Sequence, residues 1–330
     1  MGIIIPESYG GAGADYVSYA LAVESLAKVD AGAAVTLSVH AMICAAIVAI
    51  GSDAQKAKFL PRLASGDAIA AFALTEPEVG SDAASLRSTA RRDGDSYVLN
   101  GRKQWCTNGG YSSVMMGMFR TGGEGSRGIS AFLIEQPADG VTVENVTNKL
   151  GIHTSNTCDV AFDNVRVPAD AMLAAEGEGL RSALRTLTSG RIGIAAQACG
   201  ILGACLDASI TFAKDRQAFG KPIGAFEAVS FKIARMAADL NAARLATYRA
   251  AALCDAGKPF AHEASMAKLF ASTKAREHAS EALQIHGGYG YMTDFPVERY
   301  YRDAKITEIY EGTSEIQQLI IARNLLGRID

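Results

Sequence analysis

The ten residues IYEGTSEIQQ, at positions 309–318, place the carboxylate of Glu311 just before a strong signal for the start of a helix. Ser314 and Gln317 have the spacing of a capping box, so we expect a helix to begin there. Glu311 would then lie in the preceding loop, next to the flexible Gly312 and close to the positive end of that helix. A carboxylate in this position can act as a base.

Two opposite influences would act on the pKa of this carboxyl group. The helix end favours its charged form, whereas a bound apolar substrate that excludes water favours the neutral form. A group subject to both influences is suited to general base catalysis. The alternative is that Glu311 is an acidic residue favoured only by the helix dipole, and the rest of the chain has to decide between the two.

Composition limits the classes of protein to consider. The chain has 330 residues, of which 49% are hydrophobic and 20% charged, so it can bury a large core in two or three domains. Its 32 basic and 35 acidic residues give a net charge of -3, and no basic patch indicates binding to nucleic acid or to a membrane surface. The most apolar window, 33–50, is interrupted by Thr36, Ser38 and His40, which favours a buried helix over a membrane span.

The cysteines and histidines do not form a recognisable site. No CxxC pair occurs, and no histidine stands at ligand spacing from a cysteine, so we expect reduced thiols of an intracellular protein at Cys44, Cys106, Cys158, Cys199, Cys205 and Cys254. The five histidines are scattered, which argues against a metal site and against a Ser-His nucleophile. The first residues lack the basic segment and cleavage site of a leader, and we expect the chain to start in mid-domain. Since the histidines indicate neither a metal site nor a Ser-His nucleophile, we expect carboxylates to carry any acid–base chemistry.

Periodicity divides the chain into three regions. Helical spacing extends from Asp15 to about Leu63, where Asp15 and Ser52-Asp53 are plausible helix caps. Short strand-like segments follow, and Asn100-Gly101 predicts a hairpin turn between residues 97–99 and 103–105. Further strands are expected over 114–119, 129–134, 141–146 and 160–167, as an antiparallel barrel or sandwich. From Glu178 onward, long alanine-rich helices over 180–213, 226–256 and 262–285 predict an antiparallel bundle.

Three further motifs have competing interpretations. GEGSRG at 123–128 matches the dinucleotide-binding fingerprint, but it joins two strand-like segments, so we interpret it as a hairpin loop. TEPEVGSD at 75–82 can bind phosphate or a heteroaromatic edge through N–H groups, or can be a linker. Trp105, the one tryptophan, can belong to a core or can cover a flat cofactor ring.

Taken together, these motifs resemble the acyl-CoA dehydrogenase family. They occur in the family's order over nearly the whole chain, at Thr75–Asp82, Trp105–Gly110, Phe162–Pro168, Arg216–Pro222, Gln284–Gly288 and Tyr310–Gln317. The resemblance implies an α+β multi-domain fold: an incomplete N-terminal helical domain over 1–70, a middle β domain over 71–175 and a C-terminal four-helix bundle over 176–330. It implies a flavoenzyme of fatty acid β-oxidation that converts an acyl-CoA thioester to the trans-2-enoyl-CoA.

The resemblance also implies FAD, bound in an extended form without a Rossmann fold. The positions that match the family's contacts to the flavin ring are Phe72, Leu74, Thr75, Gly80, Ser81, Trp105 and Thr107. Those that match contacts to the pyrophosphate and adenosine are Arg216, Phe219, Gln284, Gly287 and Gly288, with further cofactor contacts at Thr313 and Glu315. Because the family shares this flavin across a subunit interface, we expect a homo-oligomer, a tetramer built as a dimer of dimers.

By the same resemblance, Glu311 abstracts the α-proton while hydride passes to flavin N5, and electrons then go to electron-transfer flavoprotein. Some relatives carry the base one residue before the arginine that matches Arg191; here that residue is Gly190, which favours the short-, medium- and short-branched-chain types, nearest to butyryl-CoA dehydrogenase. Substrate contacts are expected at Ser81, Arg191, Tyr310 and Gly312. The alternative for Arg191 is a structural ion pair in the bundle.

Some features depart from the family pattern. Thr188 stands where relatives have aspartate, and Glu227 where many have glutamine near the flavin adenine. Relatives carry about two more helices before the segment that begins here at Gly2, so we expect a shortened N-terminal domain. The alternatives are an acyl-CoA oxidase on the same fold and a truncated, non-catalytic relic. We expect a cytoplasmic location of bacterial type, with the mitochondrial matrix as the alternative.

Overall fold

The computed structural model describes residues 1–327, which form two compact units. The first unit comprises Met1–Asp15, Thr36–Lys149 and Ser155–Gly190. The second comprises Tyr16–Val35, Leu150–Thr154 and the described chain from Arg191 onward. The division of the sequence at residues 70 and 175 remains a prediction.

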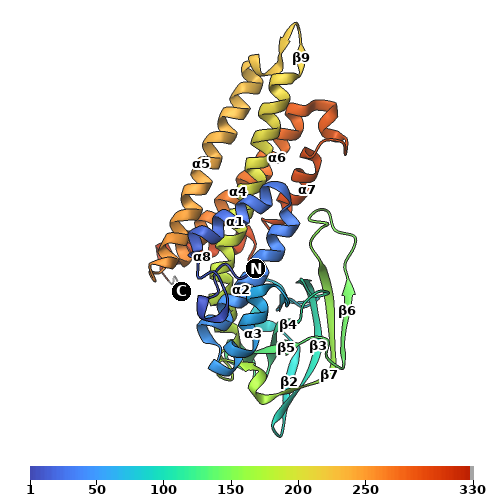
Figure 1. The fold of residues 1–330 in the computed structure, drawn as a ribbon, viewed down its shortest axis with the longest axis vertical. Helices are drawn as coiled ribbons and strands as arrows, with labels where there is room; N and C mark the ends of the chain where they lie inside the picture. Colours follow the sequence, from blue (N-terminus) through green and yellow to red (C-terminus); the bar gives the residue numbers. More distant parts are fainter. Residues whose placement is uncertain (328–330) are drawn as a thin grey trace. The chain divides into compact units, whose positions relative to one another are not determined.

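The first unit is built on a sheet. Residues 70–173 form eight strands, in the order β6-β7-β3-β2-β4-β5-β8 with β1 attached to β4 (Figure 1). The strands are β1 Ala70–Ala73, β2 Thr89–Asp93, β3 Ser96–Thr107, β4 Val114–Arg120, β5 Ile129–Glu135, β6 Val141–Asn145, β7 Thr157–Pro168 and β8 Met172–Leu173. The sheet is mixed rather than purely antiparallel, because β1 and β2 both pair with β4 in parallel.

The core of the sheet explains why these segments become strands. Almost every side chain of β4 and β5 is buried, so both strands read as continuous apolar runs rather than as an alternation. Aromatic rings meet edge to face inside the sheet, with ring centroids of Phe119 and Phe162 5.0 Å apart and those of Tyr97 and Phe132 5.1 Å apart. The predicted strands over 114–167 are confirmed, and residues 123–128 form the loop between β4 and β5, as predicted.

The predicted hairpin turn at Asn100-Gly101 is wrong. The two-residue turn lies at Gly94-Asp95, between β2 and β3, and β3 continues through Asn100 and Gly101. The register of β3 with β7 shifts at this point, as it does at a bulge. Gly101 has φ 141°, and a Cβ added there would come within 2.3 Å of Ser88 Oγ. The glycine therefore permits a bulge and a close approach rather than a turn.

Three helices precede the sheet: α1 Tyr16–Val29, α2 Ala31–Ile50 and α3 Asp53–Ser65. The expected cap of α3 is confirmed, since Ser52 and Gln55 form a complete capping box. In α2, His40 is fully buried; its Nδ1 accepts from Ala70 N at 3.2 Å, so Nε2 donates to Leu63 O at 3.1 Å. By length and composition, α2 and α4 Gly179–Asp215 are apolar enough to cross a membrane, but most of each is buried inside the protein.

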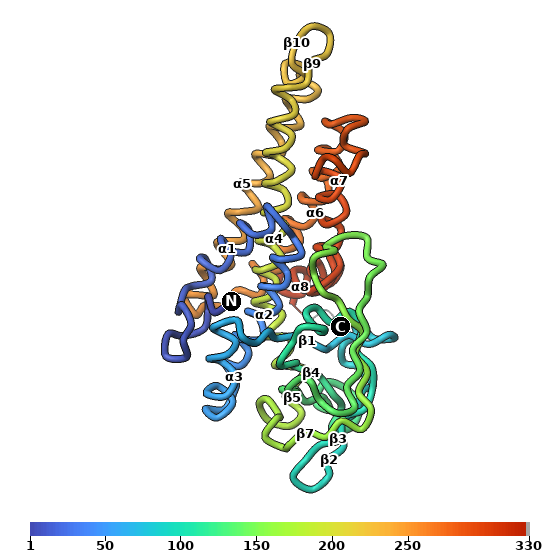
Figure 2. Tube along the Cα trace, turned by 45° about the vertical axis from the view of Figure 1, so that its right-hand side comes forward, coloured from blue at the N-terminus to red at the C-terminus, as the bar shows by residue number. Residues whose placement is uncertain are grey.

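The second unit is helical. It contains most of α4, followed by α5 Glu227–Asp255, α6 Ala261–His286, α7 Val297–Ile306 and α8 Ser314–Leu326, which confirms the predicted helical region. α6 packs against α5, α7 and α8, and its buried face is lined with alanines that allow close approach. Figures 1 and 2 show α5 beside α6, and the small hairpin of β9 Gln217–Ala218 and β10 Lys221–Pro222 beyond the end of α4.

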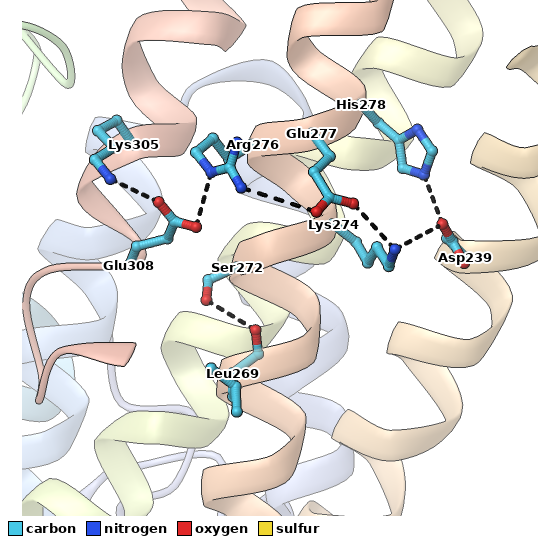
Figure 3. A network of polar contacts seen from close by, with 9 residues as sticks. All are labelled: Asp239, Leu269, Ser272, Lys274, Arg276, Glu277, His278, Lys305 and Glu308. Carbon is cyan, nitrogen blue, oxygen red and sulfur yellow. Dashed lines mark hydrogen bonds and ion pairs between the residues drawn. The ribbon is translucent and has the colours of Figure 1, made fainter. Parts of the chain in front are cut away.

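A polar network joins α5, α6 and the segment after α7 (Figure 3). Asp239 on α5 binds His278 at 2.8 Å and Lys274 at 3.6 Å, both on α6. Farther along the network, Arg276 on α6 binds Glu308 at 2.9 Å, just after α7. Because Glu308 is three residues before Glu311, the Arg276–Glu308 pair anchors one end of the turn that carries the predicted base.

Candidate active site

Glu311 lies in the turn of residues 307–313, between α7 and α8, hereafter the Glu311 turn. Its backbone has φ 56° and that of Gly312 has φ 90°, so two successive residues adopt left-handed conformations. Of the seven non-glycine residues with positive φ among residues 1–327, three are predicted site residues: Trp105, Phe219 and Glu311. Such strain is costly and gathers at functional sites, which supports a function for these three.

The start of α8 requires a correction. Its cap is Thr313, whose hydroxyl accepts from Ile316 N at 3.3 Å, and not Ser314. Ser314 is already the first helical residue, and its N–H donates to Glu308 O at 3.0 Å. The side chain of Gln317 therefore does not close a capping box; it donates to Gly312 O at 2.8 Å.

The carboxyl group of Glu311 has the properties of a base. Burial raises its pKa to about 7, and the positive charges of Arg191 and Lys268 offset part of that effect. Its Oε2 atom is buried and has no hydrogen-bond partner within the described chain. Its N–H also donates to no acceptor in residues 1–327. The group can thus exchange a proton near neutral pH and has one oxygen free to receive it.

Arg191 faces Glu311 from α4. Arg191 is 5% exposed, and burial lowers the pKa of its guanidinium, with Glu311 acting in the opposite direction. Its Nη1 is 3.5 Å from Ser265 Oγ, and its Nε has no partner among the described residues. A buried cation with an unused donor can hold a polar group of a ligand. The alternative role, a structural ion pair, would require a directly bonded carboxylate, and residues 1–327 supply none within 4.0 Å.

Lys268 on α6 is a residue that the sequence interpretation missed. Its side chain is fully buried, and Nζ donates to Gly312 O at 2.7 Å. Burial lowers its pKa to about 8, against the opposing influence of Glu311. The signal was present, because Lys268 interrupts a face of α6 that otherwise carries alanines, such as Ala264 and Ala271.

Tyr310 is fixed by a chain of hydrogen bonds. Its hydroxyl donates to Gln197 Oε1, and Gln197 Nε2 donates to Ala31 O at 2.7 Å. Burial raises the pKa of Tyr310 above its ordinary value, so the phenol stays neutral. Since its hydroxyl is engaged, the ring is the part of Tyr310 that remains for contact with a substrate.

In the first unit, the predicted ring-contact residues lie on neighbouring segments. Gln104 N donates to Thr75 O at 2.8 Å, which brings the segment after β1 alongside β3. Beneath it, Lys103 Nζ binds Glu76 Oε1 at 2.7 Å, with side-chain exposures of 0% and 6%. Glu76 also accepts from the backbone N–H groups of Arg87 and Ser88. Through Glu76, this buried pair ties the 75–81 segment to β3.

Trp105 is 56% exposed, so the interpretation of its indole as a core residue is wrong. Its backbone has φ 60°, an unusual conformation for a bulky residue. Gly80 and Ser81 are exposed, and their N–H groups donate to no acceptor within residues 1–327. An exposed aromatic plane and free N–H donors on two neighbouring segments fit a planar heteroaromatic ring such as that of a flavin. Thr107, at the end of β3, is half-buried.

In the second unit, a pocket of about 520 Å³ brings together three predicted cofactor residues: Arg216, Gly287 and Gly288. The guanidinium of Arg216 lies 5.3 Å from the ring centroid of Tyr289, and a Cβ at either glycine would meet no atom within 4 Å. A cation beside an open backbone fits a diphosphate group.

The remaining predicted cofactor residues of this unit lie elsewhere. Gln284 is in the last turn of α6, outside the pocket lining. Phe219 is at the tip of the β9–β10 hairpin and is 95% exposed. Thr313 and Glu315 lie at the start of α8.

The residues that depart from the family pattern have ordinary local roles. Thr188 Oγ1 donates to Leu184 O at 2.8 Å within α4. Glu227 is exposed in the first turn of α5, where the helix dipole favours a negative charge. All six cysteines are free, and no group of three metal-binding side chains occurs among residues 1–327.

Comparison with known protein families identifies the chain. Three family models match consecutive parts of it: the acyl-CoA dehydrogenase N-terminal domain over residues 1–67, the middle domain over 71–165 and the C-terminal domain over 177–326. The acyl-CoA dehydrogenase of Bacillus subtilis (strain 168) is 50% identical over 329 residues, which are 99% of this chain and 87% of that protein.

Two solved structures extend the similarity to the fold. Butyryl-CoA dehydrogenase from Megasphaera elsdenii superimposes with a TM-score of 0.96 at 45% identity, over 98% of this chain and 86% of that one. A chain from work on the electron transferring flavoprotein of Acidaminococcus fermentans gives a TM-score of 0.97 at 45% identity, over 99% of this chain and 87% of that one. These matches confirm the predicted multi-domain fold of helices and a sheet. The chain therefore belongs to the acyl-CoA dehydrogenase family of flavoenzymes.

Proposed function

We propose that this protein catalyses the FAD-dependent α,β-dehydrogenation of a short- to medium-chain acyl-CoA thioester to the trans-2-enoyl-CoA. The observation that carries the proposal is the state of Glu311: a buried, unpartnered Oε2 on a carboxyl group with a pKa of about 7. It occupies the position of the catalytic base in the family motif, and Gly190 leaves no alternative base beside Arg191. The similarity to a butyryl-CoA dehydrogenase supports a short acyl chain.

Glu311 acts in two ways in this proposal. Its Oε2 receives the proton of the substrate α-carbon, and its free N–H donates to the thioester carbonyl, which stabilises the negative charge that develops there. Arg191, Tyr310 and Gly312 contact the substrate from the same unit. Ser81 is proposed to contact CoA as well as the flavin.

FAD, when bound, supplies the acceptor for the β-hydrogen. We assign its ring to the exposed Gly80, Ser81 and Trp105 and the half-buried Phe72, Leu74, Thr75 and Thr107. We assign its diphosphate and adenosine to Arg216, Phe219, Gln284, Gly287 and Gly288, with Thr313 and Glu315 as further contacts. The open backbone at both glycines and the free N–H groups of Gly80 and Ser81 support this assignment.

The experiment that tests this function is substitution of the base. Glu311→Gln keeps the shape of the side chain and removes its basicity, so the variant should retain FAD and bind acyl-CoA. Its flavin should be reduced by substrate at least about 100-fold more slowly, since general base catalysis contributes factors of this size. Reduction at the wild-type rate in an anaerobic titration would refute the assignment.

We further propose electron-transfer flavoprotein as the electron acceptor, a homotetramer arranged as a dimer of dimers, and a cytoplasmic location. The similarity to a chain from work on an electron transferring flavoprotein supports the acceptor, and the bacterial relative supports the location. Reoxidation of the substrate-reduced enzyme should be faster with that acceptor than with dioxygen. Faster reoxidation by dioxygen would identify an oxidase instead.

A further inference from the structure

The carbonyl of Gly312 is held from two helices at once. Lys268 Nζ donates to it from α6 at 2.7 Å, and Gln317 Nε2 donates to it from α8 at 2.8 Å. The next peptide unit toward the N-terminus belongs to Glu311, so these two donors fix the backbone on which the proposed base stands. α6 also holds the other end of the Glu311 turn through Arg276 and Glu308 (Figure 3).

α6 thus contacts the Glu311 turn near both of its ends. Lys268 and Arg276 are eight residues apart in the sequence, which separates them by about 12 Å along the helix. Contacts on both sides of a turn can hold a residue in a strained backbone conformation, such as the left-handed one of Glu311.

The charges around Glu311 come from two helices. Arg191 on α4 and Lys268 on α6 face its carboxyl group, and both act to keep it ionised. The carboxylates of Glu308 and Glu315 also favour the charged form of Lys268, but their electrostatic influence is smaller than that of Glu311. With Glu311 ionised, the buried group of Arg191, Lys268 and Glu311 carries two positive charges and one negative charge.

We propose that Lys268 is a positioning residue for the reaction: its ammonium group holds the Gly312 carbonyl so that Glu311 stays in its left-handed turn, and its charge keeps Glu311 ionised. This role rests on the proposed function of Glu311 as the base. The hydrogen bond of Lys268 goes to the backbone of the Glu311 turn, so Lys268 would act through Glu311.

The expected consequence concerns the pH dependence of proton abstraction. The base works only when ionised, so the rate of flavin reduction by substrate rises with pH through the pKa of Glu311. Removal of a buried positive charge makes the carboxylate less favourable and moves this rise toward higher pH, by about one pH unit. A purely structural role for Lys268 would lower stability without moving the rise.

Three substitutions separate charge from hydrogen bonding. Lys268→Arg keeps both, Lys268→Gln keeps a donor but removes the charge, and Lys268→Met removes both. Lys274→Met is the matched control, because Lys274 lies on the same helix and pairs with Glu277 and Asp239 rather than with the Glu311 turn. Each variant is first checked for flavin content and thermal unfolding.

The rate of anaerobic flavin reduction by butyryl-CoA is then measured between about pH 6 and pH 9 in rapid-mixing experiments. Lys268→Gln and Lys268→Met should shift the rise to higher pH, whereas Lys268→Arg and Lys274→Met should leave it in place. If Lys268→Met does not fold, the comparison of Lys268→Gln with Lys268→Arg provides the same test. An unchanged rise in Lys268→Gln would overturn the proposal.

Glu311→Gln distinguishes this failure from that of the proposed function. If Glu311→Gln reduces its flavin normally, Glu311 is not the base and both proposals fall. If Glu311→Gln is inactive and Lys268→Gln keeps the wild-type pH profile, only the role of Lys268 falls.

Discussion

At the scale of single residues, burial controls the chemistry of the Glu311 turn. The same desolvation raises the pKa of Glu311 to about 7 and lowers that of Lys268 to about 8, so both groups change charge in or near the working range. The motif around Glu311 left two interpretations open, and its order relative to the other family motifs made Glu311 the candidate base. The contribution of Lys268 depends on its depth in the bundle, which a sequence pattern does not give.

A second buried pair offers a test of how the flavin-facing segment is held. Lys103→Met would remove the positive partner of the buried Glu76 carboxylate, which costs up to about 3–5 kcal/mol. We expect lower thermal stability and weaker retention of FAD. The control is Arg166→Met, which removes an exposed pair with Asp93 and should leave both unchanged. Equal flavin retention in the two variants would contradict this role.

His40 makes a stability prediction with a definite direction. Burial lowers its pKa from 6.5 to about 4, so the folded protein keeps the imidazole neutral. Above pH 6.5 the imidazole is neutral in the folded and the unfolded chain, and its stabilising contribution is complete. As the pH falls from 6.5 toward 4, the unfolded chain binds the proton more readily than the folded chain, so the free energy of unfolding decreases. The gap between the two pKa values corresponds to about 3 kcal/mol.

Urea unfolding of the wild type and of His40→Gln at pH 8 and pH 5 measures this effect. The wild type should lose more stability between the two pH values than the variant does. Parallel losses would show that His40 is not the group responsible. Because the substitution also changes packing, the difference between pH values, rather than the absolute midpoint, is the quantity to compare.

At the scale of elements, the long helices and most strands follow from local sequence, since alanine-rich segments with glycine and proline breaks favour helices and short apolar runs favour strands. The errors occur where two local signals compete. Asn100-Gly101 is a favourable turn sequence, but in the structure Gly101 lies at a bulge, where Ser88 approaches too closely for a Cβ atom. Thr313 and Ser314 are both competent caps, and the bond from Ser314 N to Glu308 O makes Thr313 the cap.

The cap of α8 can be tested directly. Thr313→Ala removes the acceptor for Ile316 N and should destabilise the protein by about 1 kcal/mol. Ser314→Ala should cost less, because Ser314 Oγ is 3.5 Å from its nearest acceptor, Glu308 O. Thermal unfolding of the two variants measures the two losses of stability. A larger loss in Ser314→Ala than in Thr313→Ala would support Ser314 as the cap, as the sequence predicted.

At the scale of the whole molecule, the predicted site residues are distributed over two compact units. The first unit carries the exposed Trp105 and the segment that ends at Ser81, while the second carries Glu311, Arg191 and the pocket beside Arg216. The family could be predicted because its motifs follow one another along nearly the entire sequence. The 95% exposure of Phe219 could not be predicted, because it depends on the projection of the β9–β10 hairpin.

The decisive measurement is an anaerobic titration of the flavin absorption band with butyryl-CoA, in the wild type and in Glu311→Gln. The wild-type band should bleach as the substrate is oxidised. The Glu311→Gln band should persist, although the ligand still binds and FAD is still present. Bleaching of the variant at the wild-type rate, or failure of the wild-type band to bleach with acyl-CoAs of every length, would contradict the assignment of Glu311 as the base of an acyl-CoA dehydrogenation.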